Sequence, residues 1–351
     1  MRKTIEKDRS VEPMAAKHES RHNVQLTAAE IGQLWSTYIN DSMAKCVLRY
    51  FVNKVEDAEI KSVLEYSLHL STHHLQMIGD IFSHENHPIP HGFTDEDVNI
   101  HAPRLYTDTF MLNYVKLFGR LGLQYYGFSA NMAARSDVHD FFAECVSSTM
   151  ELATRADQVL LSKGLYMRPP YIPIPEEVEF VQKQSFLHGF FGDTRPLTAM
   201  EITHLFANIQ TNTLGKATLL GFAQTAKSKT VRQHFLRGIE IAEKHAEVFS
   251  SCLRAEDIPA PMGFESNVTD STDAPFSDKL MMYHGTALSQ ASQLNYGFAL
   301  GTAMRKDIGL LYSRLMAEVA KYMEDGANIM IDHEWLEKIP CAVERKALTN
   351  V

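Results

Sequence analysis

The sequence repeats itself at a nearly constant offset, and this repeat limits the possible folds more than any other feature. The segment LTAAEI at 26–31 recurs as LTAMEI at 197–202, an offset of 171. The same offset aligns His74 with His245, and after a one-residue deletion the offset becomes 170. Further matches at these offsets include Pro88 with Pro259, Gly92 with Gly263, Phe93 with Phe264, Tyr126 with Tyr296 and Arg135 with Arg305. The chain therefore consists of two copies of one structural unit.

Each copy predicts four helices, because its apolar residues recur about one helical turn apart in four stretches. In the second copy these stripes run from Ile202 to Leu219, Phe235 to Cys252, Leu280 to Phe298 and Ile308 to Tyr322. Capping-box spacing precedes the first helix of each copy, and acidic residues suited to N-cap positions precede the fourth. These residues are Thr27 with Glu30, Thr198 with Glu201, Asp137 and Asp307.

Connection lengths predict the topology. Only a few residues join helices one and two, or three and four, so each pair is expected to form an antiparallel hairpin. Helices two and three are separated by a longer stretch rich in proline and glycine, which is the ferritin-like arrangement. We therefore expect an all-α fold of two tandem ferritin-like four-helix bundles, each with a long crossover between helices two and three. The expected divisions are a charged disordered tail at 1–23, bundles at 24–175 and 197–345, and a linker at 176–196.

Composition excludes several classes of protein. The net charge of −9 over 351 residues argues against a nucleic-acid partner, which needs a basic surface. No apolar run approaches the roughly 20 residues of a membrane helix, and the first residues lack the apolar core of a secretory signal. The four cysteines are far apart and form no CxxC motif, which favours free thiols in a reducing compartment. We expect a cytoplasmic protein.

The stretch HENHPIPHGF at 84–93 resembles a metal-binding loop, but the second copy reads AEDIPAPMGF at 255–264. All three histidines are lost there, while the prolines and the Gly-Phe pair remain. Both copies therefore keep the residues that shape a turn. The prolines fix φ, and Gly92 and Gly263 permit positive φ. We interpret the stretch as a corner of the crossover and its histidines as solvated loop residues.

Metal chemistry has one candidate site. Ferritin-like oxidases need inward carboxylates and two Glu-x-x-His motifs, and the chain offers only Glu201-Ile-Thr-His204, whose glutamate belongs to a helix cap. His245 and His284 are expected to point into the second bundle, with Glu318 at its margin. They suit a single Fe, Mn or Zn ion. Alternatively, they form a buried polar cluster in which each histidine finds a hydrogen-bond partner.

Three stretches of the second copy carry a family resemblance: FSDKLMMYH at 276–284, YGFALGTAMRKDI at 296–308 and NIMIDHEWLEKIP at 328–340. With their weaker counterparts in the first half, the chain resembles an uncharacterised family of tandem ferritin-like bundles from spore-forming bacilli. That family is similar in fold to the spore coat protein F group. The resemblance implies a sporulation-associated or spore-coat role. Lys, Asn, Ser and Tyr stand where a ferritin-like ancestor would have metal-binding carboxylates, so inherited oxidase chemistry is not implied.

We therefore expect a non-enzymatic structural or interaction protein, with a place in the spore coat implied by the resemblance. Two alternatives stay open. The first is a metal-binding protein with a site in the second bundle only, and the second is a carrier that holds an apolar ligand within a bundle. Protein partners or self-association are expected, without a cofactor, a nucleic acid or a membrane.

Overall fold

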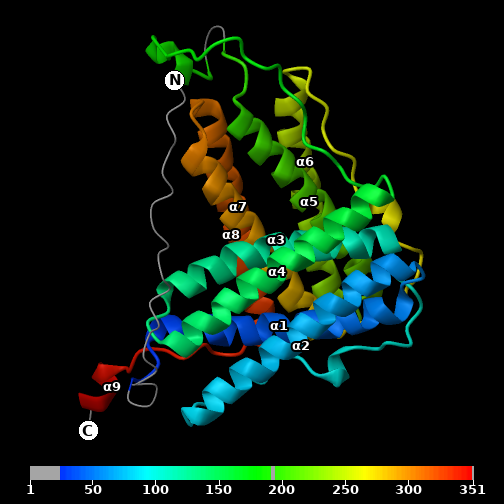
Figure 1. Ribbon diagram of the computed structural model, residues 1–351. Helices are drawn as coiled ribbons and strands as arrows, with labels where there is room; N and C mark the ends of the chain where they lie inside the picture. The colour runs from blue at the N-terminus through cyan, green and yellow to red at the C-terminus, as the bar shows by residue number, and fades with distance from the viewer. Residues whose placement is uncertain (1–23, 191–193, 350–351) are drawn as a thin grey trace, which may run out of the picture.

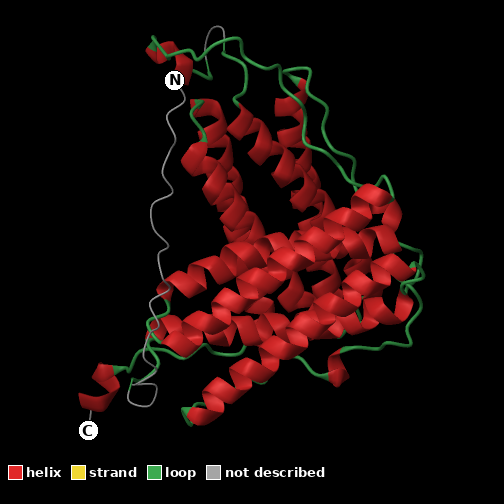
Figure 2. Cartoon of the chain, in the orientation of Figure 1, coloured by secondary structure: helices red, strands yellow, loops and turns green. Residues whose placement is uncertain are grey.

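The computed structural model describes residues 24–190 and 194–349, and these residues form helices and loops without a strand (Figure 2). The disordered tail predicted at 1–23 lies outside the described residues. Each copy of the repeat folds into four long helices. In unit 1 they are α1 (Ala28–Lys54), α2 (Ala58–His84), α3 (Asp108–Met132) and α4 (Ser136–Ser162). In unit 2 they are α5 (Ala199–Thr225), α6 (Lys229–Arg254), α7 (Asp278–Thr302) and α8 (Lys306–Asp332).

The connections agree with the predicted topology. Three residues join α1 to α2 and α3 to α4, whereas the crossover from α2 to α3 spans 85–107 and contains the 3₁₀ turn η1 (Asp95–Asp97). Unit 2 repeats this plan, with η3 (Glu265–Asn267) in its crossover at 255–277. The 3₁₀ turn η2 (Gln184–Leu187) lies in the linker and the short α9 (Arg345–Thr349) lies after unit 2. Figure 1 shows the helices of unit 2 crossing those of unit 1 at a steep angle.

One glutamate in each unit caps two helices. The Thr27–Glu30 and Thr198–Glu201 capping boxes are both formed, as predicted. The second carboxylate oxygen of Glu30 accepts hydrogen bonds from the backbone N–H groups of Ala134 and Arg135, at the start of α4. Glu201 does the same at the start of α8. A buried carboxylate thus satisfies the N-termini of the first and fourth helices together.

The predicted N-caps of α4 and α8 are wrong by two residues. Arg135 and Arg305 occupy the N-cap positions. Asp137 and Asp307 lie in the first turn, where each carboxylate accepts two hydrogen bonds from the guanidinium of its N-cap arginine. The glutamate of α1 or α5 has taken over the capping role, so the aspartates instead hold the arginines in place.

The two units are related by an approximate two-fold axis, and their crossovers pair along it. Val98 bridges Phe276, and Tyr106 bridges Val268. At the offset of 170, Val98 is equivalent to Val268 and Tyr106 to Phe276, so each bridge is the symmetry mate of the other. This reciprocity is the signature of an isologous interface, in which residue i meets j and j meets i.

Backbone hydrogen bonds follow the same symmetry. Ser277 N–H donates to Asp97 O, and its equivalent Thr107 N–H donates to Asn267 O, both at 3.0 Å. The pair next to them joins Asn99 N–H to Pro275 O at 2.8 Å and Thr269 N–H to Leu105 O at 2.9 Å. The two irregular crossovers thus satisfy one another's backbone groups, which neither could do alone in a buried position.

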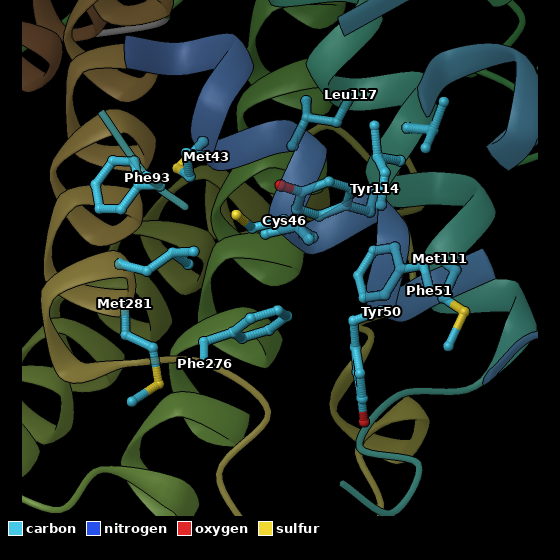
Figure 3. Packing of buried hydrophobic residues seen from close by; sticks show 14 of the residues in the cluster. Met43, Cys46, Tyr50, Phe51, Phe93, Met111, Tyr114, Leu117, Phe276 and Met281 are labelled. Carbon is cyan, nitrogen blue, oxygen red and sulfur yellow. The ribbon is translucent and has the colours of Figure 1, made fainter. Parts of the chain in front are cut away.

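The hydrophobic core continues through this interface. Phe276 and Met281 of unit 2 lie across from Tyr50 and Phe51 of unit 1, and the Tyr50 and Phe276 rings meet edge-on at 5.3 Å (Figure 3). The larger buried cluster contains residues of both units, and a smaller one fills the far end of unit 2. The two units therefore share one hydrophobic core and are not independently packed domains.

The crossover corner contains one conformationally demanding glycine, not the predicted two. Gly92 has φ +62°, and a Cβ there would lie 2.5 Å from the Ser42 hydroxyl oxygen, which accepts a hydrogen bond from Phe93 N–H. The backbone N–H of Gly92 donates a hydrogen bond to the carboxylate of Glu337, in the segment after α8. Gly263 does not have positive φ, and a Cβ there would meet only the end of the flexible Glu265 side chain. The prediction for Gly263 was wrong because the two corners do not share one backbone conformation.

We expect Gly92→Ala to lower the free energy of unfolding by more than about 1 kcal/mol, since it combines an unfavourable φ with a steric clash. Gly263→Ala is the matched control and should change it by less than about 0.5 kcal/mol. Urea unfolding of both variants measures the difference. Equal losses would show that the left-handed conformation at Gly92 is not what the corner depends on.

Candidate functional site

Unit 1 contains a cavity of about 190 Å³ between its four helices, closed on one side by α7 of unit 2. Most of the wall is apolar, and the polar side chains include a histidine–aspartate pair. Apolar lining residues include Leu48, Leu70, Val115, Phe118 and Leu152, and the α7 contribution is Ala287, Gln290, Ala291 and Leu294. A cavity engineered into another protein, of about 150 Å³, is large enough to bind benzene.

The equivalent space in unit 2 is only about 50 Å³ and is lined by the equivalent positions. The difference has an identifiable cause. Tyr322 stands where unit 1 has Leu152, and its ring reaches over Gly238, where a Cβ would collide with the Tyr322 hydroxyl. Unit 1 has Ser67 at the position of Gly238. A large residue opposite a glycine thus plugs the second cavity.

The unit 1 cavity is bordered by a buried histidine–aspartate pair. His74 on α2 lies with its Nδ1 3.1 Å from Oδ2 of Asp41 on α1, and both side chains are less than one-tenth exposed. Although burial alone would lower it, the Asp41 carboxylate raises the pKa of His74 above its ordinary value. Because a carboxylate only accepts, Nδ1 carries a proton. Among the described residues Nε2 has no hydrogen-bond partner.

The equivalent histidine in unit 2 is fully satisfied. Nε2 of His245 lies 3.2 Å from Glu318, and Nδ1 lies 3.0 Å from the hydroxyl of Tyr296, which also bonds to Asn212. Lys244 holds the Glu318 carboxylate at 2.8 Å. Burial lowers the pKa of His245, and Glu318 only partly offsets this. His245 is therefore a neutral member of a closed hydrogen-bond network.

His284, the third predicted metal ligand, lies at the interface between the units. Its Nε2 is 3.1 Å from the hydroxyl of Tyr114, and at the offset of 170 these two residues are equivalent. They meet on the approximate two-fold axis, so the expected pairing of His284 with His245 inside one bundle is wrong. Nδ1 of His284 is buried without a partner among the described residues, and burial lowers the pKa of His284 to about 3.

The structure therefore brings together two of the three predicted ligands, His245 and Glu318. The described residues contain no group of three or more His, Cys, Asp or Glu side chains placed to hold a metal ion. A single Fe, Mn or Zn ion at this position stays a prediction. The Glu201-Ile-Thr-His204 motif is confirmed as a capping element. Although burial opposes it, hydrogen bonds from Arg195 and the backbone lower the pKa of Glu201 to about 2.

His284 predicts a specific acid sensitivity. Its folded-state pKa lies below the roughly 6.5 of an unfolded histidine, so between about pH 6 and pH 3 the unfolded state binds more protons. Stability falls as the pH falls through that window, by about 1.4 kcal/mol per pH unit from this residue. In His284→Gln this contribution should vanish, so the stability gap between wild type and variant should narrow on acidification. Urea unfolding at several pH values measures the gap; parallel profiles would contradict the assignment.

These features define an all-helical protein built from two copies of a four-helix unit, with an open interior in the first copy and a plugged one in the second. The chain belongs to the DUF3231 family, described as "Protein of unknown function (DUF3231)", whose model matches residues 15–178 and again 185–348. The two matches correspond to the two units of the repeat.

Among solved structures, the chain is similar to a putative spore coat protein from Bacillus halodurans. The TM-score is 0.40 with 14% sequence identity, over 43% of this chain and 98% of that one. No curated protein matches the sequence. None of the helices within the described residues has the length and apolar character needed to cross a membrane.

Proposed function

We propose that the protein binds a small, mainly apolar molecule in the cavity of unit 1 and is not an enzyme. The observation that carries the proposal is the difference between two equivalent sites in one chain, about 190 Å³ against about 50 Å³. Unit 2 demonstrates that this fold can fill the space. The open space in unit 1 is thus a property of particular residues, chiefly Leu152 and Ser67, and not of the architecture.

The energetic cost supports the same conclusion. Empty apolar cavities lower stability by about 24 cal/mol per Å³. The difference between the sites, about 140 Å³, then corresponds to roughly 3 kcal/mol. That is a large share of the 5–15 kcal/mol by which proteins typically resist unfolding. A bound ligand would recover this stability in unit 1.

The double variant Ser67→Gly/Leu152→Tyr transplants the unit 2 plug into unit 1. Toluene and benzyl alcohol serve as probes, because their rings are close in size to the cavity. We expect saturating probe to raise the Tm of the wild type by several degrees, since binding at a hundredfold excess over Kd contributes about 2.7 kcal/mol. The plugged variant should melt at least as high as the free wild type and show no probe-dependent shift.

A matched control opens the other unit. Gly238→Ser/Tyr322→Leu should lower the Tm of the free protein and leave the unit 1 response to the probes unchanged. If neither probe shifts the wild type, or if the plugged variant responds equally, the cavity of unit 1 is not a binding site.

A ferritin-like origin for each unit is part of this proposal. It is supported by four helices of nearly equal length, short hairpin connections and one long crossover between the second and third helices. In such bundles the interior between the helices is where ligands and cofactors bind. The spore-former origin implied by the sequence resemblance, and a place in the spore coat, stay predictions.

A structural or interaction role is the second candidate, and the whole segment between α4 and α5, here termed the linker, favours it. Residues 169–190 contain no long helix, and several large apolar side chains there are almost fully exposed. The most exposed are Tyr171 at 87%, Ile174 at 92%, Val178 at 84% and Phe180 at 85%. Large apolar side chains gathered in one short exposed segment make that segment a candidate interaction site.

We expect the linker to mediate self-association. Replacing Tyr171, Ile174 and Phe180 together by serine should leave the Tm unchanged, because these side chains contact little in the folded units. It should shift the sedimentation profile at high protein concentration toward smaller species. Identical sedimentation of variant and wild type would show that the linker does not mediate self-association.

A further inference from the structure

A second, smaller pocket lies between the two units and carries positive charge. It has a volume of about 40 Å³ and is bounded by α3, α4 and the residue Met167 of unit 1 and by α5 and the crossover of unit 2. Its wall combines two amide side chains, the cations Lys116 and Arg120, and an apolar part made of Leu117, Leu160, Met167, Leu214 and Phe264. One water needs about 10–15 Å³ of such volume, so the pocket can hold a group of a few non-hydrogen atoms.

The two cations differ in what balances their charge. Nζ of Lys116 lies 2.6 Å from Oδ1 of Asp157 and 3.6 Å from the centre of the Tyr166 ring, so unit 1 itself offsets this charge. Arg120 forms no ion pair with a carboxylate among the described residues. Its side chain makes one hydrogen bond, from Nη2 to the neutral hydroxyl of Thr211 at 3.0 Å. Arg120 is therefore the charge that the residues around the pocket leave unbalanced.

This imbalance cannot be relieved by loss of a proton. Burial lowers the pKa of Arg120, and no neighbouring carboxylate opposes that shift. Arginine nevertheless keeps its charge in proteins, and a charge that is partly removed from water without a counterion is costly. Within the described part of the chain, the buried side-chain atoms without a partner include no nitrogen of Arg120. Its remaining N–H donors are therefore within reach of a molecule that enters from solvent.

The other half of the repeat shows what can face such a corner. At the offset of 170, Met167 is equivalent to Glu337. The Glu337 carboxylate accepts hydrogen bonds from the backbone N–H groups of His91 and Gly92, at the crossover corner of unit 1. The pocket beside the crossover of unit 2 has methionine at the equivalent position and no carboxylate from it. The chain thus supplies an acid to one corner and places a cation without an acid at the other.

Size and wall chemistry select among anions. A carboxylate is planar and matches the fork of a guanidinium through two parallel hydrogen bonds. A short hydrocarbon group suits the apolar part of the wall. Phosphate also pairs with arginine, but it is polar on every side and would turn some of its oxygens toward apolar side chains, where they find no partner. A small aliphatic acid satisfies both parts of the pocket.

We propose that Arg120 binds the carboxylate of a small aliphatic acid, of the size of acetate or propionate, in the pocket between the units, with the carbon chain against the apolar wall. This site is separate from the cavity of unit 1 and does not depend on the function proposed for that cavity.

Three probes of similar size test the ligand class: propionate, propan-1-ol and inorganic phosphate. Each is titrated into the full-length protein at neutral pH and constant ionic strength, and binding is followed by NMR of the probe. We expect propionate to bind at least tenfold more tightly than either of the others, because it alone combines a charge-assisted hydrogen bond to a guanidinium with burial of a hydrocarbon group.

Two variants take their residues from the equivalent positions of the repeat. Arg120→Gln introduces the residue found at Gln290 and should weaken propionate binding at least tenfold, without lowering the Tm of the free protein. Met167→Glu introduces the acid found at Glu337. Its carboxylate should pair with Arg120, raise the Tm of the free protein and weaken propionate binding to the same extent. Arg155→Gln removes an exposed arginine of α4 and is the control, which should bind propionate as the wild type does.

The outcomes decide the assignment. Loss of propionate binding in both pocket variants, with binding retained in Arg155→Gln, supports the site, and agreement between two different substitutions excludes a folding artefact of one. If the wild type does not bind propionate, or if Arg120→Gln binds it as tightly as the wild type, the pocket is not an anion site. Tighter binding of phosphate than of propionate would overturn the assignment of a carboxylic acid.

Discussion

The pairing of the two crossovers is the constraint on which the rest of the structure depends. A crossover of about 20 residues without a regular helix leaves backbone donors and acceptors that must be satisfied where they are buried. Here each crossover does this for the other, through symmetric bonds such as Ser277 to Asp97 and Thr107 to Asn267. The same axis brings Tyr114 against His284 and joins the apolar interiors into one core. Each unit is therefore completed by its partner, in the way that a subunit of an isologous dimer is completed by the other.

The two-fold symmetry also shapes the candidate site, because one wall of the unit 1 cavity comes from unit 2. The unit 1 cavity is bounded by α7 of unit 2 as well as by its own helices. The corresponding wall of unit 2 carries Arg120 of α3, whose guanidinium bonds to Thr211, a residue that lines the smaller cavity. The wall that unit 2 presents to the unit 1 cavity carries Gln290 of α7 at the position equivalent to Arg120, and the space there is wider. The two interiors differ because residues from the opposite unit, as well as the local residues Leu152 and Tyr322, fill them unequally.

Much of the fold could be predicted from the sequence, because the two copies of the repeat can be aligned with each other. The helices, their hairpin connections and the two capping boxes follow from periodicity and from residue chemistry in a single segment. The partner of His284 could not be predicted in this way. Periodicity shows which face of a helix is buried, but the element that covers the face depends on how the units pack. The prediction that Gly263 has positive φ was wrong for a related reason. Two copies of a turn with similar sequences need not have the same φ at the glycine. The difference between the cavities does leave a trace in the sequence, because unit 1 has Leu152 and Ser67 where unit 2 has Tyr322 and Gly238. These two exchanges predict a cavity only once it is known that the two positions face each other.

Fusing two units into one chain permits what a dimer of identical chains does not. In a symmetric homodimer a residue on the two-fold axis meets its own copy, so position 284 would place histidine against histidine or tyrosine against tyrosine. The tandem chain places Tyr114 against His284, a donor beside a neutral ring nitrogen, which satisfies one of the two buried groups with the other. The same freedom allows one unit to keep an open interior, with a histidine that bonds to Asp41 through Nδ1, while the other unit is plugged and its histidine bonds through both ring nitrogens.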